Sequence, residues 1–505
     1  MDDNSRKSTP EFNDLGRGSR LQTTRNRVVS IWGRLDNYFR SSVGAVLEIV
    51  GLPKPLFSIV IFILTLAFVM PVFNQGDLNH TVVSSYAYLN GHFADFYDFN
   101  QPRMWGNDYL PILYLIFAIW MAPYFFLGLP VASESMGEFS LVPGEIIGIY
   151  PSEMIWAKLL LVVFFLGSVI LVHRISKILH PTEANRQSVA VWVYVLSPFA
   201  LFSFGVFSQY DIIGVVFTLA AIYRFLQRRM VGFAVLIGIA LTFKFFAALL
   251  VLPLLLLSNK SWQQTFKLGL ITLIPLFLQF AFYWSNESFR ARIFVQLTSK
   301  AGGAATTWEA YFGVVAYLAI LIGALFSSKW IGTFEQKTLF FVLASYGLML
   351  NMVVWHPQWV ILLSPFIALL VSYLRRPTLW MVWESIAFFV FIGFVVTFFQ
   401  GNVDAVMISR GALGGVIPPT YVPMSQFVPA ELFPWLLPFL KLYFLSPAIS
   451  MLKPMYRGAS NQQAISSFVW VSRSLTLWVA FIGPALIAVY FPEVVLQVFS
   501  FGPQG

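Results

Sequence analysis

Apolar runs of about 20 residues recur from residue 56 to residue 491, and a helix of that length spans the hydrocarbon core of a bilayer. Of the 505 residues, 58% are hydrophobic and only 11% are charged, and the mean hydropathy is +0.73. A soluble domain carries about 25% charged residues, so this chain has too little charge to cover a water-facing surface. The sequence therefore predicts an all-α, polytopic transmembrane bundle of about 12–14 spans.

The predicted spans are residues 56–73, 109–128, 154–172, 188–207, 211–226, 231–244, 245–258, 266–284, 309–327, 338–355, 358–374, 379–399, 431–450 and 468–491. Basic residues gather in alternate loops: Arg228, Arg229, Lys260, Lys267, Lys329, Lys337, Arg375, Arg376, Lys453 and Arg457. Because cytoplasmic loops carry an excess of Lys and Arg, we assign these loops to the cytoplasm. Residues 209–211, 285–307, 356–358 and 400–430 are then expected together on the outer side, and the N-terminus is expected in the cytoplasm.

Three parts of the chain are less regular. Residues 1–55 are expected to form a basic cytoplasmic tail that is partly disordered. The charges near the third span require one more crossing, or a re-entrant segment, between residues 74 and 153. Residues 231–258 fit either one long helix or two short ones.

Charge distribution and cysteine content exclude several classes of function. The formal net charge is +9, but the basic residues lie in short clusters between apolar runs rather than in one stripe. They orient a membrane protein, and no nucleic-acid partner is expected. The chain has no cysteine, which excludes disulfides, thiolate metal sites and a cysteine nucleophile.

The segment that follows the first span, residues 74–108, is unusually rich in acidic residues and histidine. Its polar members include Asp77, His80, Asp95, Asp98 and Asp108. One interpretation is a surface-lying active-site loop in which an acid serves as general base. The other is a solvated outer loop with aromatic anchors at the membrane interface, and composition alone leaves both open.

Further polar residues interrupt the apolar runs on the same predicted side. They are Gln209 and Asp211, then Lys244, then His356 and Gln358. An ionisable residue at membrane depth is costly and is by default a candidate for function. The alternatives are a snorkelling lysine, a loop histidine and an aspartate that caps a helix. Glu384, Lys441 and Arg473 also fall within predicted spans, and for these we favour a structural role.

Together these elements resemble the GT-C superfamily of integral membrane glycosyltransferases, and most closely the polyprenyl-phosphate-mannose-dependent mannosyltransferases. The resemblance covers most of residues 56–375. It rests on Asp77 and His80, on Asp108-Tyr109-Leu110-Pro111, on Ser208-Gln209-Tyr210-Asp211, on Gly232, Gly238 and Lys244, and on His356 with Gln358. Ser208 stands where a glycine is usual, Leu110 where a second proline is frequent, and no acid-x-acid pair is present at Asp77. Residues 376–505 are expected to form C-terminal transmembrane helices without a motif.

The resemblance implies transfer of a sugar, by analogy mannose, from a polyprenyl monophosphate to an acceptor hydroxyl at the outer or lumenal face, with inversion. It implies Asp77 as general base, with Asp95, Asp98 or Asp108 as alternatives. The other implied donor- and acceptor-binding residues are His80, Asp108, Tyr109, Gln209, Asp211, Lys244, His356 and Gln358. Of these, Lys244 and His356 would gather the charge of the leaving phosphate. No cofactor is expected, although a divalent metal between Asp77 and Asp211 is the alternative.

The expected partners are a lipid-linked sugar donor, membrane lipids, and an acceptor that is a lipid, a glycan or a protein. The membrane would be a bacterial plasma membrane or the endoplasmic reticulum. A transporter or flippase for a lipid-linked sugar is the main alternative, and it predicts charged residues near the middle of several spans. A polysaccharide polymerase or ligase is the second alternative, and the 400–430 segment with Asp404 and Arg410 keeps it open.

Overall fold

The structure is a computed structural model of the whole chain. It describes residues 54–100, 109–132, 149–258, 261–294, 308–329, 332–352, 356–399, 403–414, 422–452, 465 and 467–491. Every regular element in these ranges is a helix, which confirms the all-α polytopic bundle.

The helices follow in chain order. They are α2 (Lys54–Val72), α3 (Gly76–Leu89), α4 (Phe96–Asn100), α5 (Pro111–Phe126), α7 (Pro151–Leu179), α8 (Ala184–Val195), α9 (Pro198–Ala200), η1 (Leu201–Val206), α10 (Asp211–Leu226), α11 (Met230–Phe243), η2 (Phe245–Ala247), α12 (Ala248–Ser258), α13 (Trp262–Tyr283), α15 (Trp308–Leu325), η3 (Ser327–Lys329), α16 (Phe334–Met352), η4 (Pro357–Leu362), α17 (Ser364–Tyr373), α18 (Pro377–Phe398), α19 (Val403–Ser409), η6 (Met424–Phe427), η7 (Ala430–Leu432), α20 (Phe433–Leu452), α21 (Ser467–Leu477), η9 (Trp478–Ile482) and α22 (Gly483–Tyr490).

Six of the helical stretches are long and apolar enough to cross a membrane, so the chain is an integral membrane protein. They are Pro151–Leu179, Ala184–Val206, Trp262–Tyr283, Pro377–Phe398, Ala430–Leu452 and Val469–Tyr490. A bent pair of helices, Phe57–Val72 with Gly76–Leu89, qualifies as a seventh span. Shorter apolar helices lie at Pro111–Phe126, Met230–Phe243, Phe245–Ser258, Tyr311–Leu325 and Pro357–Tyr373.

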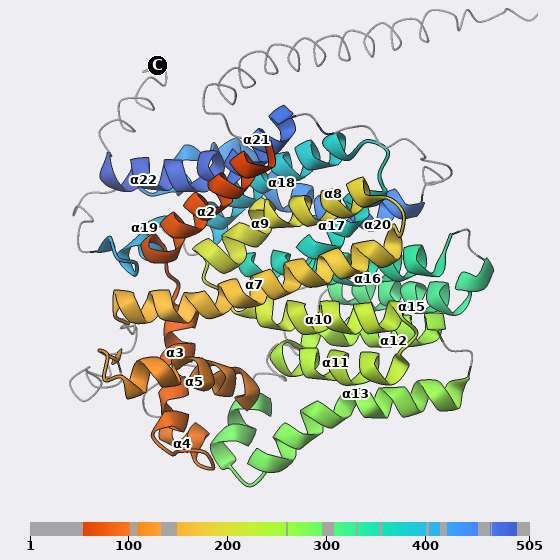
Figure 1. Cartoon of the computed structure of the whole chain (residues 1–505), viewed down its shortest axis with the longest axis horizontal. Coiled ribbons are helices and arrows are strands. Elements are labelled where there is room, and N and C mark those ends of the chain that lie inside the picture. The colour runs from red at the N-terminus through yellow and green to blue at the C-terminus, as the bar shows by residue number, and fades with distance from the viewer. Residues whose placement is uncertain are drawn as a thin grey trace, which may run out of the picture.

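Helix α3 lies within the segment that the sequence suggests is a surface-lying loop. It is bent by 70° from α2, and Figure 1 shows it crosswise to α7, near one end of the long helices. Most of its side chains are buried, because it packs between α4, α5 and α7. The number of membrane crossings between residues 74 and 153 stays a prediction.

The bend between α2 and α3 is held by a buried lysine of α7. Lys158 is fully buried, and its Nζ donates to the carbonyl oxygens of Val69 at 3.1 Å and of Phe73 at 2.7 Å. Carbonyls at a helix C-terminus have no partner within the helix, and a cation there also favours the helix dipole. Lys158 therefore fixes the point at which α2 stops.

The long helices form one bundle around a continuous apolar core. Helix α10 packs against α7 and α11, and α11 packs in turn against α13, as Figure 1 shows in adjacent rows. A Cβ on Gly238 of α11 would collide with the carbonyl oxygen of Thr272 in α13, so this glycine permits the close approach. The late helices join the same bundle, since α20 packs on α16 and α21 on α2.

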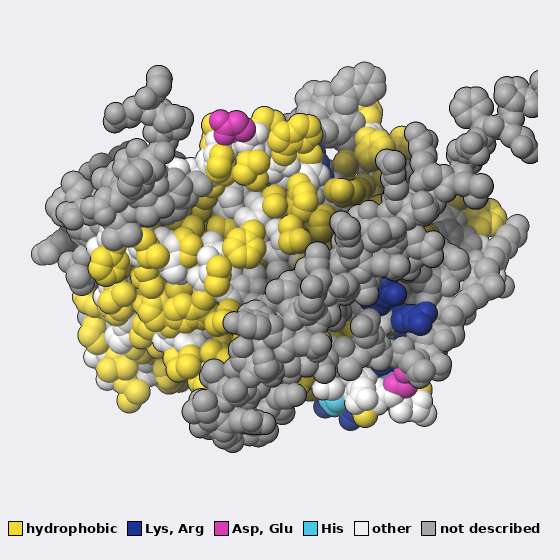
Figure 2. Space-filling model, turned by 90° about the horizontal axis from the view of Figure 1, so that it is seen from above, with side chains coloured by type: hydrophobic (Ala, Val, Ile, Leu, Met, Phe, Trp, Pro, Cys, Tyr) yellow, Lys and Arg dark blue, Asp and Glu magenta, His cyan; other side chains and the backbone are white. Residues whose placement is uncertain are grey.

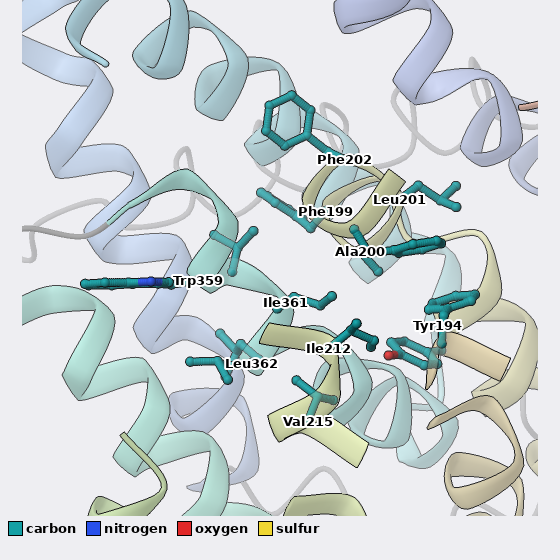
Figure 3. Packing of buried hydrophobic residues seen from close by; sticks show 14 of the residues in the cluster. Tyr194, Phe199, Ala200, Leu201, Phe202, Ile212, Val215, Trp359, Ile361 and Leu362 are labelled. Atoms are coloured by element: carbon teal, nitrogen blue, oxygen red, sulfur yellow. The ribbon is translucent and has the colours of Figure 1, made fainter. Parts of the chain in front are cut away.

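The core and the surface show the expected separation of side chains. Figure 3 shows the core side chains Phe199, Ala200, Leu201, Phe202, Ile212, Val215, Trp359, Ile361 and Leu362, which come from α9, η1, α10 and η4. In Figure 2, hydrophobic side chains cover much of the face that is seen, and Lys and Arg gather toward its right-hand end. A hydrophobic exterior with basic residues at one end suits a bundle in a bilayer.

Two charged residues within the spans form a buried ion pair. Arg473 Nη2 lies 3.0 Å from Glu384 Oε2, and both side chains are 1% exposed. Ser197 Oγ also donates to Glu384, and Arg473 Nη2 donates to the carbonyl oxygen of Val193. The pair thus joins α18, α21 and the α8–α9 stretch, which is the kind of structural role that the sequence favours for both residues.

Candidate active site

The break between α2 and α3 positions Asp77 in the first turn of α3. The side-chain oxygen of Gln75 accepts a hydrogen bond from the Asp77 backbone nitrogen at 2.9 Å, and Asn74 Oδ1 accepts one from Gln75 N at 2.9 Å. Asn74 Nδ2 donates to Asn79 Oδ1 at 2.7 Å. The bonds to backbone nitrogens satisfy donors that a helix start leaves unpaired. Together the three bonds fix the first turn of α3, which carries Asp77.

Gln209, which is 132 positions later in the sequence, holds the Asp77 carboxylate. Its Nε2 donates to Asp77 Oδ2 at 3.1 Å, while its Oε1 accepts from the backbone nitrogen of Tyr210 at 3.0 Å. The second bond determines which way the amide points, so the NH₂ group must face Asp77. The Gln209 side chain is completely buried and both ends are used. The hydrogen bonds thus use Gln209 to fix Asp77, whereas the resemblance implies a donor- or acceptor-binding role for it.

The backbone that presents Gln209 is irregular. Residues Leu201–Val206 form a π-helix, and Ser208 has a φ of +56°, in the left-handed region. Glycine adopts that conformation without the steric penalty that a side chain brings. Ser208 is thus a serine in a conformation that favours glycine, the residue usual at this position in the family that the sequence resembles.

Replacing Ser208 with glycine is expected to raise stability by about 0.5–1 kcal/mol, because it removes the cost of a left-handed side chain. The Ser208 hydroxyl contact with the Val206 carbonyl is long, at 3.4 Å, so little is lost with it. The midpoint of thermal unfolding in detergent would measure this. Ser203→Gly is the matched control, because Ser203 is equally buried but lies inside η1, where glycine is expected to destabilise. Parallel shifts of both variants would contradict the explanation.

Asp211 and Lys244 form a second pair beside Gln209. Lys244 Nζ lies 3.0 Å from Asp211 Oδ1, and the two side chains are 12% and 2% exposed. Lys244 has an extended backbone that ends α11, so residues 231–258 form two helices that are interrupted at this lysine. The interruption lets the ammonium group reach the first residue of α10.

Aromatic rings surround this ion pair. The Lys244 ammonium lies 5.0 Å from the ring centroid of Tyr109 and 5.5 Å from that of Trp359, within the range of cation–π attraction. Tyr109 also packs edge-to-face on Tyr210, with ring centroids 5.2 Å apart. The rings reduce access of water, which strengthens the electrostatic interactions among the charges they enclose.

The two carboxylates and the lysine act as one electrostatic cluster. Lys244 interacts electrostatically with Asp77 as well as with Asp211, and the two acids interact with each other. The structure thus brings together residues 77, 109, 209, 211 and 244, five of the positions that the sequence singles out.

The other predicted site residues lie nearby or stand apart. His80 is one turn after Asp77 and interacts electrostatically with it, and His80 Nδ1 is buried without a hydrogen bond. His356 is exposed, lies within electrostatic range of Asp211, and has its ring centroid 4.9 Å from that of Trp359. Gln358 is buried, and its Oε1 accepts no hydrogen bond in the part of the chain that the structure describes.

The alternative bases lie beyond the far end of α3. Asp95 is paired with His92 Nδ1 at 2.9 Å, and this hydrogen bond lowers the pKa of the Asp95 carboxyl. Asp98 accepts a hydrogen bond from Asn286 Nδ2 at 2.7 Å. Leu89, at the end of α3, is twelve positions after Asp77, which is about 18 Å along the helix axis. Asp108 lies outside the described residues, so no position is assigned to it.

Arg410 also lies at this site, although the sequence gives no signal that places it there. A Cβ on Gly76 would lie 3.0 Å from Arg410 Nη1, so the guanidinium sits directly over the start of α3. Arg410 interacts electrostatically with Asp77 and with His80. It follows a short helix in a loop between two late spans, where sequence pattern alone gives no distance to Asp77.

The acidic and histidine side chains at this site can be compared with the ligand set that a metal ion needs. Within the described ranges, His, Asp and Glu side chains form no group of three or more that could hold a metal. Each of the two acids already has a partner, Gln209 for Asp77 and Lys244 for Asp211. The reaction without a cofactor stays a prediction.

Comparisons with known proteins found little. No protein-family model and no curated protein matches the chain. The similar solved structures include ArnT from Cupriavidus metallidurans bound to undecaprenyl phosphate, with 12% identity and a TM-score of 0.42, covering 86% of this chain and 78% of that one. The same protein in the apo state has 11% identity and a TM-score of 0.40, covering 92% of each chain. Similarity at this level does not assign the chain to a family.

Proposed function

We propose that this chain is a membrane glycosyltransferase of the GT-C type, which transfers a sugar from a polyprenyl-phosphate donor to an acceptor hydroxyl. One observation carries the proposal. Segments that are distant in sequence bring Asp77, Gln209, Asp211, Lys244 and Tyr109 into one partly buried cluster. These are residues for which the resemblance implies donor or acceptor chemistry, and a purely structural bundle does not require them to converge.

Asp77 is the proposed general base. As the acceptor oxygen attacks the anomeric carbon, its proton passes to the Asp77 carboxylate, and the bond between that carbon and the phosphate oxygen breaks. The electron pair of the broken bond stays with the phosphate, and attack from the opposite face inverts the anomeric carbon. Asp77 is half-buried, so it is accessible to an acceptor, while Gln209 holds one of its oxygens in place. A positioned base of this kind typically contributes about 10²–10⁴ in rate.

The Asp211–Lys244 pair has a supporting role in this proposal. Its ammonium group lies among aromatic rings, where a fixed charge stabilises a developing negative charge more strongly than in water. His356, which precedes η4, and Gln358 on η4 are the proposed partners for the sugar or the phosphate. Mannose is the proposed sugar from the resemblance, and the acceptor is a lipid, a glycan or a protein.

The site is proposed to face the outer or lumenal side of the membrane. The basic residues Arg228, Arg229, Arg375 and Arg376 lie in loops at the opposite helix ends from Asp211 and Pro357. Since cytoplasmic loops carry more Lys and Arg, we assign those loops to the cytoplasm, and a cytoplasmic N-terminus stays a prediction. A lipid-linked donor suits this arrangement, because its chain stays in the bilayer while its sugar reaches the interface.

The test is a transfer assay with the purified chain in lipid nanodiscs. We expect radiolabel to move from polyprenyl-phosphate mannose to an acceptor in a lipid extract of the source membrane, and no transfer from a nucleotide sugar. Reconstituted vesicles provide the second measurement. If the chain transfers no sugar from any polyprenyl-phosphate donor, yet carries the labelled lipid across the vesicle bilayer, it is a flippase and the proposal is wrong.

A further inference from the structure

Arg410 reaches the site from a loop that docks on the α2–α3 break. Ala412 N donates to the carbonyl oxygen of Pro71 at 2.8 Å, and Asn74 N donates to that of Met407 at 2.9 Å. A Cβ on Gly411 would collide with the carbonyl oxygen of Val72, so a glycine is needed for the backbones to come this close. The position of the Arg410 backbone is therefore fixed by the same break that positions Asp77.

The base of this loop is also anchored on its far side. Asp404 is fully buried and accepts a hydrogen bond from the backbone nitrogen of Met424 at 3.1 Å. With these contacts in place, the Arg410 guanidinium lies over Gly76 at the start of α3. The loop thus resembles a support for one side chain more than a simple connection between spans.

The two cations at the site differ, because Lys244 has an ion-pair partner and Arg410 has none among the described residues. Lys244 is held 3.0 Å from Asp211, so its charge is already paired. Within the described ranges, the Arg410 guanidinium makes no hydrogen bond or direct ion pair, and its Nε is buried without a partner. A guanidinium presents donors in a fixed fork that fits the oxygens of a phosphate two at a time. An anion that enters beside Asp77 would satisfy these donors.

We propose that Arg410 binds the phosphate group of the lipid-linked donor and holds it as the leaving group. This inference rests on the proposed function. When the bond between the anomeric carbon and the phosphate oxygen breaks, the phosphodiester with one negative charge becomes a phosphomonoester with two. The acceptor proton goes to Asp77, and the added negative charge on the phosphate lies beside Arg410. Lys244 stays paired with Asp211 throughout.

The experiment is equilibrium binding of a fluorescent polyprenyl phosphate, and of the matching polyprenol without phosphate, to the full chain in nanodiscs. We expect the wild type to prefer the phosphate, and Arg410→Gln to bind it about 10- to 100-fold more weakly with polyprenol binding unchanged. Arg410→Lys keeps the charge but loses the fork, so an intermediate affinity is expected. Arg375→Gln, an exposed arginine in a loop at the opposite helix ends, is the matched control.

The outcomes separate this inference from the proposed function. If Arg410→Gln binds the phosphate as the wild type does while both transfer sugar, the role of Arg410 is wrong and the function stands. If the wild type does not distinguish the phosphate from the polyprenol and transfers no sugar, the role of Arg410 and the proposed function are both wrong. Should Arg410→Gln fail to fold, Arg410→Lys decides, because wild-type affinity in a folded lysine variant also overturns the role.

Discussion

Asp77→Asn is expected to lower the rate of sugar transfer by about 10²–10⁴-fold, because an amide cannot take the acceptor proton. The substitution keeps the shape of the side chain and leaves an oxygen that accepts the Gln209 hydrogen bond. The fold and donor binding should therefore survive. Initial rates of transfer at saturating donor, together with the unfolding midpoint, would separate lost chemistry from lost structure.

Asp95→Asn is the matched control for this experiment. It is the same substitution in the same polar segment, but Asp95 is exposed and paired with His92 beyond the far end of α3. We expect it to transfer sugar at close to the wild-type rate. A large loss in Asp95→Asn with none in Asp77→Asn would move the general base to the α4 region and contradict the assignment.

Lys244→Met is expected to lower the free energy of unfolding by about 3–5 kcal/mol, since it leaves the buried Asp211 carboxylate without its partner. The Asp211 side chain is 2% exposed, and its second oxygen accepts no hydrogen bond among the described residues. The substitution therefore leaves a buried carboxylate whose described ion-pair partner is gone. Chemical denaturation in mixed micelles would measure the change, with the exposed Lys267→Met as control.

A double variant tests the pairing itself. Lys244→Met with Asp211→Asn removes both charges, so it should be destabilised by less than the sum of the two single variants. Strict additivity would show that the two side chains do not act as a pair. The double variant should also lose activity even where it is stable, because the aromatic enclosure then contains no fixed cation at Lys244.

The apolar runs and their polar interruptions predict much of this arrangement. Asp211 begins one predicted span and Lys244 ends the next. The basic residues in the loop between these spans therefore place both on the same, outer side of the membrane. The order of the helices follows from the same runs. For residues 231–258, the sequence leaves one long helix or two short ones open, with the boundary between the two at Lys244. The structure has two helices, and the Lys244–Asp211 ion pair lies at the break between them.

The remaining features depend on contacts between distant segments. The helical form of α3 and its 70° bend arise from packing against α5 and α7 and from the lysine that caps α2. Gln209 looks like a ligand for a sugar in sequence, yet its amide is used internally. Arg410 could not be placed near Asp77, because its loop has neither periodicity nor a motif and is positioned by backbone contacts alone.

The docking of the Arg410 loop also sets the order of events during biosynthesis. Asn74 and Arg410 are 336 positions apart in sequence, and the loop completes the site only after the chain is translated past both. At about 5–20 residues per second, roughly 15–70 s pass between the two. Throughout that interval, the nascent chain carries Asp77 in the membrane without the arginine beside it. If Arg410 has the proposed role, a chain that ends before this loop should therefore bind a lipid-linked phosphate more weakly than the full chain does.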